Sequence, residues 1–163
     1  MATYSSITEF TEALERAKLA IPAMVTVAVK PTIKQLAAGI RLRVSSTGKD
    51  SDNGSFSPYS EKYKSRKKKA GSGAYGKTTA FKNFYLSGTM WNGFGELGTN
   101  LSGMVITSEI GFAGSNNYAS NRELNEIHSD NEKQGIAYPT KQEELEFVAR
   151  VEEIVYQSLI QLI

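Results

Sequence analysis

Residues 139–163 read PTKQEELEFVARVEEIVYQSLIQLI, and this stretch carries the clearest structural signal in the chain. Thr140 and Glu143 have the spacing of a capping box, in which each side chain satisfies a backbone N–H at the start of a helix. Apolar residues then recur at intervals of three and four, at Leu145, Val148, Val151, Val155, Leu159 and Leu162. The outer face is acidic, with Glu143, Glu144, Glu146, Glu152 and Glu153. The stretch predicts a C-terminal helix from about 140 to 163 that the fold requires, because its apolar stripe has to be buried.

A second capping pair, Ser6 and Glu9, begins a similar pattern near the other end of the chain. The apolar residues that follow predict a helix from about residue 7 to 20, and they are Ile7, Phe10, Leu14, Ala17 and Ile21. Pro22 closes this helix or opens the next one, which helical spacing predicts over residues 24–44 with a kink at Pro31. Because residues 24–29 are rich in β-branched side chains, a helix that begins only near Thr32 is the competing interpretation.

The middle of the chain predicts an antiparallel hairpin. In residues 103–112, GMVITSEIGF, one side of the pattern holds Met104, Ile106, Ser108, Ile110 and Phe112, and the other holds Val105, Thr107 and Glu109. A period of two is typical of a half-buried strand. Residues 91–97 are expected to pair with this strand across the turn-rich residues 97–103.

Residues 81–94 hold the densest apolar and aromatic cluster, which predicts core, at Phe81, Phe84, Tyr85, Leu86, Met90, Trp91 and Phe94. Residues 116–134 predict a polar helix with Tyr118, Leu124 and Ile127 facing inward. The fold class that follows is α+β, with a small antiparallel sheet flanked by N-terminal and C-terminal helices and a long basic loop or arm. Residues 1–163 are expected to form a single domain.

The composition excludes several classes of protein. The 163 residues are 40% hydrophobic and 22% charged, a globular balance, and no apolar run is long enough to cross a membrane. The chain has no cysteine, so disulfides, thiolate metal sites and cysteine nucleophiles are excluded. The first residues lack the basic and apolar regions of a secretory signal, which predicts synthesis in the cytoplasm. With one histidine, His128, in the chain, we expect a binding or structural protein and not an enzyme.

Charge is distributed unevenly along the chain. Formal charge is +1 over residues 1–40, +8 over residues 41–82 and −7 over residues 83–163. Such a chain can meet copies of itself with opposite charges facing, or it can present its basic region to an anion. Solvated charge without a partner is the plainer alternative.

The basic region coincides with a predicted mobile arm over residues 45–80, which is rich in turn formers and carries a short helix from about 58 to 69. Its candidate contact residues for a partner or for DNA are Lys62, Lys64, Arg66, Lys67, Lys68 and Lys69, with Tyr59, Tyr63 and Tyr75 nearby. A solvated loop, a protein contact and a nucleic-acid contact all remain open. No base-reading motif accompanies the run.

Two further motifs suggest chemistry but lack its context. Residues 71–78, GSGAYGKT, have the spacing of a phosphate-binding loop, yet no apolar strand precedes them. His128 stands near Glu126 and Asp130, but helical spacing points these side chains in different directions, so we interpret it as a surface or interface histidine. No catalytic, cofactor-binding or metal site is predicted. A small hydrolase with a polar pocket, lined by residues such as Asn92, Asn116 and Asn117, remains a further alternative.

The order of these segments resembles the phage virion morphogenesis family of neck and tail-completion proteins. The resemblance runs over residues 56–163 through FSPYSEKYKSRKKK, FYLSGTMWNGF, an antiparallel strand, YASNRELNEIHSDNEKQG and a C-terminal helix. A Leu-Thr-Gly-x-Leu motif that starts the sheet in that family matches Leu86, Ser87, Gly88, Thr89 and Met90. A later Tyr-Ala…His-x-x-Gly segment matches Tyr118, Ala119, Ile127, His128 and Gly135, although the His128 to Gly135 spacing is longer. The family's Pro-x-Arg-Pro-Phe-Leu segment has only YPTKQEEL as its counterpart, without the arginine.

The resemblance implies a small α+β domain with several antiparallel strands that assembles into a ring at the joint between a phage capsid's portal and its tail. It implies no catalysis and no cofactor. The expected partners are copies of this chain, the portal, adaptor or tail proteins of the virion, and the packaged DNA, with no membrane. The expected location is the virion, after synthesis in the host cytoplasm. The alternative function is a non-enzymatic nucleic-acid-binding module that uses residues 62–69.

Overall fold

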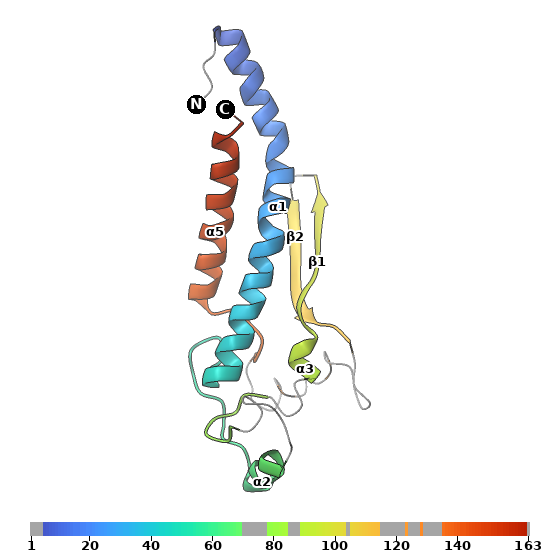
Figure 1. The fold of residues 1–163 in the computed structure, drawn as a ribbon, viewed down its shortest axis with the longest axis vertical. Helices are drawn as coiled ribbons and strands as arrows, with labels where there is room; N and C mark the ends of the chain where they lie inside the picture. The colour runs from blue at the N-terminus through green and yellow to red at the C-terminus, as the bar shows by residue number, and fades with distance from the viewer. Residues whose placement is uncertain are drawn as a thin grey trace.

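The computed structural model describes residues 5–69, 78–84, 89–103, 105–114, 123, 128 and 135–162. Its elements are α1 (Ile7–Thr47), α2 (Glu61–Lys69), α3 (Thr89–Asn92), β1 (Phe94–Ser102), β2 (Val105–Phe112) and α5 (Lys141–Ile160). The molecule is elongated, with α1 in the middle, α5 along one side of it and the β1–β2 hairpin along the other (Figure 1). The predicted α+β class, with an N-terminal helix, a small antiparallel sheet and a C-terminal helix, is confirmed.

Helix α1 is one continuous helix of 41 residues, so the predicted break at Pro22 is wrong, and so is a helix that begins only near Thr32. Both Pro22 and Pro31 lie inside it. A proline in a helix interior costs about 3 kcal/mol in local terms. Packing on either side offsets that cost, because α1 contacts both α5 and the hairpin. The predicted N-cap is confirmed, since the Ser6 side chain accepts a hydrogen bond from the Glu9 N–H.

The hairpin pairs β1 with β2 in antiparallel register, as predicted. Its connection differs from the prediction, because residues 97–102 belong to the strand β1 and the chain reverses only at Gly103, where φ is +60°. A bulge between Glu96 and Gly98 leaves Leu97 without a partner in the register. The predicted alternation holds in β2. Its half-buried or buried residues are Ile106, Ser108, Ile110 and Phe112, and its exposed ones are Val105, Thr107 and Glu109.

The aromatic core lies where the C-terminal half of α1 meets α3 and the open ends of the two strands. It consists of Val44, Phe56, Phe84, Met90, Trp91, Phe112 and Ile136. Trp91 is fully buried, stacks edge-on against Phe94 at 5.5 Å and donates its indole N–H to the Asn83 carbonyl at 3.2 Å. The predicted core over residues 81–94 is thus confirmed at Phe84, Met90 and Trp91, whereas Tyr85 and Leu86 lie outside the described residues.

The long basic arm predicted over residues 45–80 is not confirmed in the part that the structure describes. Its first three residues complete α1, and the following loop closes on itself through a bridge between Lys49 and Ser55. The Asp50 carboxylate accepts the Gly54 N–H at 2.7 Å inside that loop. Phe56 then enters the core, and α2 follows within the helix predicted at 58–69. Residues 70–77, which include most of the GSGAYGKT motif, lie outside the described residues.

The structure also bears on expectations drawn from the family resemblance and from the helical pattern of residues 116–134. The motif matched at residues 86–90 was expected to start the sheet, but Thr89 and Met90 belong to α3, and β1 begins only at Phe94. The sheet has two strands in the described ranges. The predicted helix at 116–134 falls almost entirely outside those ranges, and only Glu123 and His128 of it are described. The His128 ring lies 5.1 Å from that of Phe84.

Candidate interaction surfaces

Helix α2 lies at the end of the molecule farthest from the start of α1 (Figure 1). Lys67 attaches it there, because this side chain is 0% exposed. Its ammonium donates to the Tyr59 hydroxyl at 3.1 Å and to the Asn83 side-chain oxygen, and it lies 4.6 Å from the centre of the Tyr59 ring. The Tyr59 hydroxyl also accepts the backbone N–H groups of Asn83 and Phe84. A lysine therefore connects the basic helix to the segment that enters the aromatic core.

This burial corrects the predicted contact set. Lys67 is not accessible to DNA or to a partner, and Lys64 pairs with Glu61 at 2.6 Å. The exposed members of the set are Lys62, Arg66, Lys68 and Lys69. The helical period of the sequence is the signal that could have separated the docked side chains from the exposed ones. Tyr63 and Lys67, four residues apart, share the docked face, while Lys62, Arg66 and Lys69 share a different, exposed one.

Substitution of Lys67 tests this attachment through its pH dependence. Burial lowers the pKa of Lys67 to about 8, from 10.5 in the unfolded chain. Between these values the unfolded chain binds more protons than the folded one, so this group makes the folded state more stable as pH rises. The destabilisation is present in full below about pH 8. Relative to Lys67→Met, the free energy of unfolding of the wild-type protein should rise by on the order of 1–2 kcal/mol between pH 7 and pH 9.5.

Urea denaturation of both proteins at the two pH values measures this gain. Lys67→Arg is the matched control, because a guanidinium keeps its charge throughout this range and should stay destabilised at both pH values. A difference between wild type and Lys67→Met that does not change with pH would contradict the assignment.

Helix α5 begins as predicted, with the Thr140 and Glu143 capping box formed in full. The expectation that its apolar stripe is buried is wrong, because none of its residues is buried. Half-buried residues recur at Phe147, Val151, Ile154 and Ser158, the spacing of a face turned toward one neighbouring helix. Beyond that face, Leu145 is 54% exposed, Val148 49% and Tyr156 60%. The apolar stripe of α5 is wider than the strip that α1 covers.

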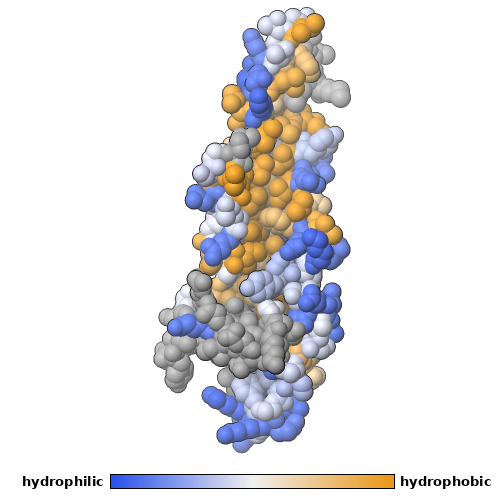
Figure 2. Space-filling model, turned by 180° about the vertical axis from the view of Figure 1, so that it is seen from behind, coloured by the Kyte–Doolittle hydropathy of each residue, from blue (hydrophilic) through white to orange (hydrophobic). Residues whose placement is uncertain are grey.

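The start of α1 adds to this uncovered apolar surface. Ile7, Phe10 and Leu14 are exposed on it, and the start of α1 lies at the same end of the molecule as the end of α5 (Figure 1). Ile160 and Leu162, near the end of α5, are also about half exposed. Seen from behind, a continuous apolar band follows the long axis over the upper and middle parts of the molecule, whereas the end that carries α2 is hydrophilic (Figure 2). The chain thus has one apolar region and one basic end.

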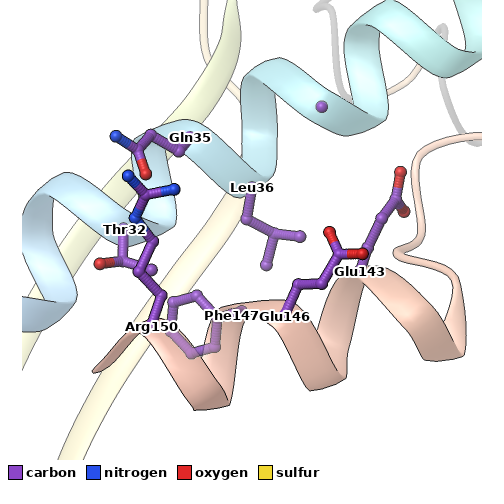
Figure 3. Close-up of a pocket in the computed structure, with 8 residues that line it drawn as sticks. Thr32, Gln35, Leu36, Glu143, Glu146, Phe147 and Arg150 are labelled. Carbon is purple, nitrogen blue, oxygen red and sulfur yellow. The ribbon is translucent and has the colours of Figure 1, made fainter. Parts of the chain in front are cut away.

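A groove of about 190 Å³ lies between α1 and α5. Leu36 of α1 and Phe147 of α5 meet in it, and charged side chains stand around them (Figure 3). Its lining residues are Thr32, Gln35, Leu36, Gly39, Glu143, Glu146, Phe147 and Arg150. A Cβ at Gly39 would meet no atom within 4 Å, so the groove is open at that point. The groove offers an apolar floor, with Glu143 and Glu146 on one side and Arg150 on the other (Figure 3).

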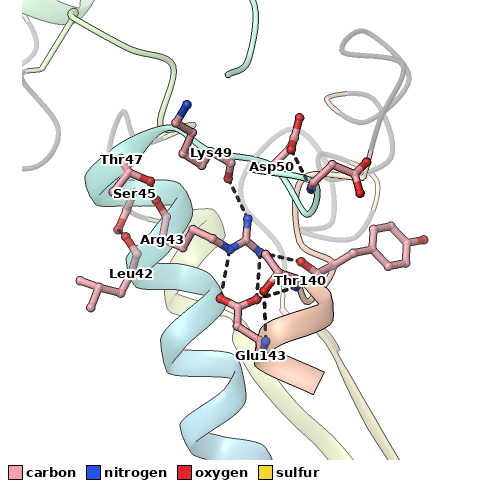
Figure 4. A network of polar contacts seen from close by, with 10 residues as sticks. Leu42, Arg43, Ser45, Thr47, Lys49, Asp50, Thr140 and Glu143 are labelled. Carbon is pink, nitrogen blue, oxygen red and sulfur yellow. Dashed lines mark hydrogen bonds and ion pairs between the residues drawn. The ribbon is translucent and has the colours of Figure 1, made fainter. Parts of the chain in front are cut away.

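A partly buried ion pair fixes the start of α5 against the end of α1 (Figure 4). The Arg43 guanidinium binds both carboxylate oxygens of Glu143, at 3.0 and 3.3 Å. It also donates to the carbonyls of Lys49 at 2.8 Å and Tyr138 at 2.6 Å. Side-chain exposure is only 12% for Arg43 and 18% for Glu143. This arrangement holds the α1 and α5 surfaces in one relative position.

The described residues contain no group of three or more His, Asp or Glu side chains that could hold a metal ion. Asn92, proposed above for a hydrolase pocket, is exposed at the end of α3 and does not line the groove, and Asn116 and Asn117 lie outside the described ranges. Within those ranges, no helix is both long enough and apolar enough to cross a membrane.

Comparisons of the whole chain with protein-family models, with curated proteins and with solved structures find no match.

Proposed function

We propose that this protein is a non-enzymatic structural subunit that forms a ring with copies of itself at the phage head–tail joint, within the virion. The observation that carries self-assembly is the state of α5, a 20-residue helix without a buried side chain. The resemblance over residues 56–163 supports the location at the joint. It also supports portal, adaptor or tail proteins as the further partners.

Physical chemistry favours assembly over a monomer. Soluble monomers rarely expose large continuous apolar patches, and such patches mark interaction sites. Burial of apolar surface contributes roughly 25 cal/mol per Å², so the exposed stripe of α5 and the apolar start of α1 are a substantial driving force. In a closed ring the same contact is repeated at each subunit, so a modest contact suffices.

Making the apolar stripe polar tests this proposal. Wild type is expected to be oligomeric in light scattering, and the triple variant Leu145→Asp, Val148→Asp and Tyr156→Asp is expected to be monomeric. These side chains are about half exposed, so the variant should keep its helix content by circular dichroism.

A conservative triple variant, Leu145→Met, Val148→Ile and Tyr156→Phe, keeps the surface apolar and should assemble as wild type does. The proposal fails if wild type is monomeric at every concentration measured, or if the aspartate variant assembles normally.

The second candidate function is nucleic-acid binding by residues 62–69. The observation that favours it is the shared exposed face of Lys62, Arg66 and Lys69. Each phosphate contact would release counterions, so binding to duplex DNA should weaken steeply as salt rises. If this second function is correct, the wild-type protein binds DNA as a monomer. The assembly proposal instead predicts an oligomer.

A further inference from the structure

We infer that the exposed cationic face of α2 in one copy binds the acidic outer face of α5 in the next copy. This inference rests on the proposed self-assembly and names its directing contact. The inference rests on two charged surfaces, one on each of the two copies that meet. Both are built from side chains that form no salt bridge within the described part of the chain.

On α2 the available cations are Lys62, Arg66 and Lys69. They follow a spacing of four and three residues, which places them on one side of the helix. All three are exposed, and none pairs with a carboxylate in the described ranges. The attachment through the buried Lys67 holds the helix while these three side chains stay exposed.

On α5 the matching carboxylates are Glu146 and Glu153. Glu143 pairs with Arg43 and Glu144 with Lys141, so those two already have cationic partners. Glu146 and Glu153 instead accept hydrogen bonds from neutral amides, of Gln142 at 2.7 Å and of Gln157 at 2.8 Å. Both are exposed. Neither forms a salt bridge in the described residues, and with the exposed Arg150 between them along the helix this face keeps a net negative charge.

The spacing of the two surfaces matches. Glu146 and Glu153 are seven residues apart on α5, and so are Lys62 and Lys69 on α2, about 10.5 Å along each helix axis. The two faces cannot meet within one chain. Helix α2 is held at the far end of the molecule, near the core, whereas residues 146–153 lie along α1 (Figure 1). The contact therefore joins two copies.

The charges and the apolar surface have different roles in this contact. An exposed ion pair by itself contributes little to affinity, because both charges stay hydrated and salt screens them. The uncovered apolar stripe of α5 supplies affinity, and the ion pairs select the partner face and the orientation. A basic face that binds an acidic face elsewhere on the same chain makes a head-to-tail contact, which closes into a ring where the rotation permits.

Paired charge reversals test this contact. One variant carries Lys62→Glu, Arg66→Glu and Lys69→Glu, and the other carries Glu146→Lys and Glu153→Lys. In the first both faces are acidic, and in the second both are basic, so neither should associate with itself. We expect the concentration for half-assembly to rise at least about tenfold for each variant alone. In an equimolar mixture every contact joins opposite charges again, and light scattering should show assembly.

A control keeps the charge change of the first variant but moves it to exposed α1 residues, with Arg16→Glu, Lys18→Glu and Lys30→Glu. It should assemble as wild type does. The inference is overturned if either reversed variant assembles normally alone, if mixing does not restore assembly, or if the control also dissociates. These results leave the proposed self-assembly standing so long as wild type is oligomeric and the α5 aspartate variant is not.

Duplex DNA serves as the competing probe. If the cationic face binds a neighbouring copy, assembled wild type should bind a 20-base-pair duplex no better than the α2 reversal variant does. Tight, salt-sensitive binding that the α2 reversal abolishes, together with failure of the mixture to assemble, would assign this face to nucleic acid instead.

Discussion

Trp91→Ala should lower the free energy of unfolding by about 3–5 kcal/mol, the largest single loss expected for this chain. The indole is fully buried and packs against both Phe94 and Phe112, with ring centres at 5.5 and 5.7 Å. Its removal leaves a cavity where α3 meets both strands. It also leaves the Asn83 carbonyl without the indole N–H that it accepts.

Chemical denaturation monitored by circular dichroism measures this loss. Tyr138→Ala is a suitable control, because it also removes an aromatic ring but at a side chain that is 63% exposed. The control should change stability by less than about 1 kcal/mol. Equal losses in the two variants would show that the aromatic cluster is not the stabilising core.

Arg43→Ala should destabilise the protein by about 3 kcal/mol, because it leaves the Glu143 carboxylate largely buried without its cation. The same change removes the hydrogen bonds to the carbonyls of Lys49 and Tyr138. Since this guanidinium joins the end of α1 to the start of α5, we expect α5 to become more accessible to proteases before global unfolding.

A double-mutant cycle with Glu143→Ala measures the coupling between the two side chains. Arg43→Lys is the control for charge alone. It keeps the positive charge but not the forked geometry, and it should lose part of the stability. If the losses of unfolding free energy caused by Arg43→Ala and by Glu143→Ala simply add in the double variant, the ion pair does not join the helices.

Much of the secondary structure could be predicted because it depends on neighbours in sequence. The caps at Ser6 and at Thr140 join residues three positions apart, so the chain itself shows them. The strand β2 follows from its alternation over residues 104–112. The turn of the hairpin was placed too early, because glycine and asparagine in residues 97–103 indicate a turn, whereas pairing with β2 keeps 97–102 extended.

The candidate surfaces were less predictable. Six cations within residues 62–69 look equivalent in sequence, and only the fold separates the buried Lys67 from its exposed neighbours. The predicted charge division between the basic and acidic regions does correspond to two separate surfaces, on α2 and on α5. Which carboxylates remain available depended on pairing across the fold, as with Glu143 and Arg43, 100 residues apart.

The sequence by itself determined the helix starts, the strand period, the basic and acidic regions and the apolar stripe of the C-terminal helix. Those features arise from contacts within a few residues, or from composition, and need no distant partner. Only the tertiary structure decided that α1 continues through Pro22 and Pro31, that Lys67 is buried, and that α1 is the main neighbour of α5 among the described elements. Burial depends on which segments pack together from far along the chain, so an apolar stripe indicates that a helix needs a partner, but not whether its own chain supplies one.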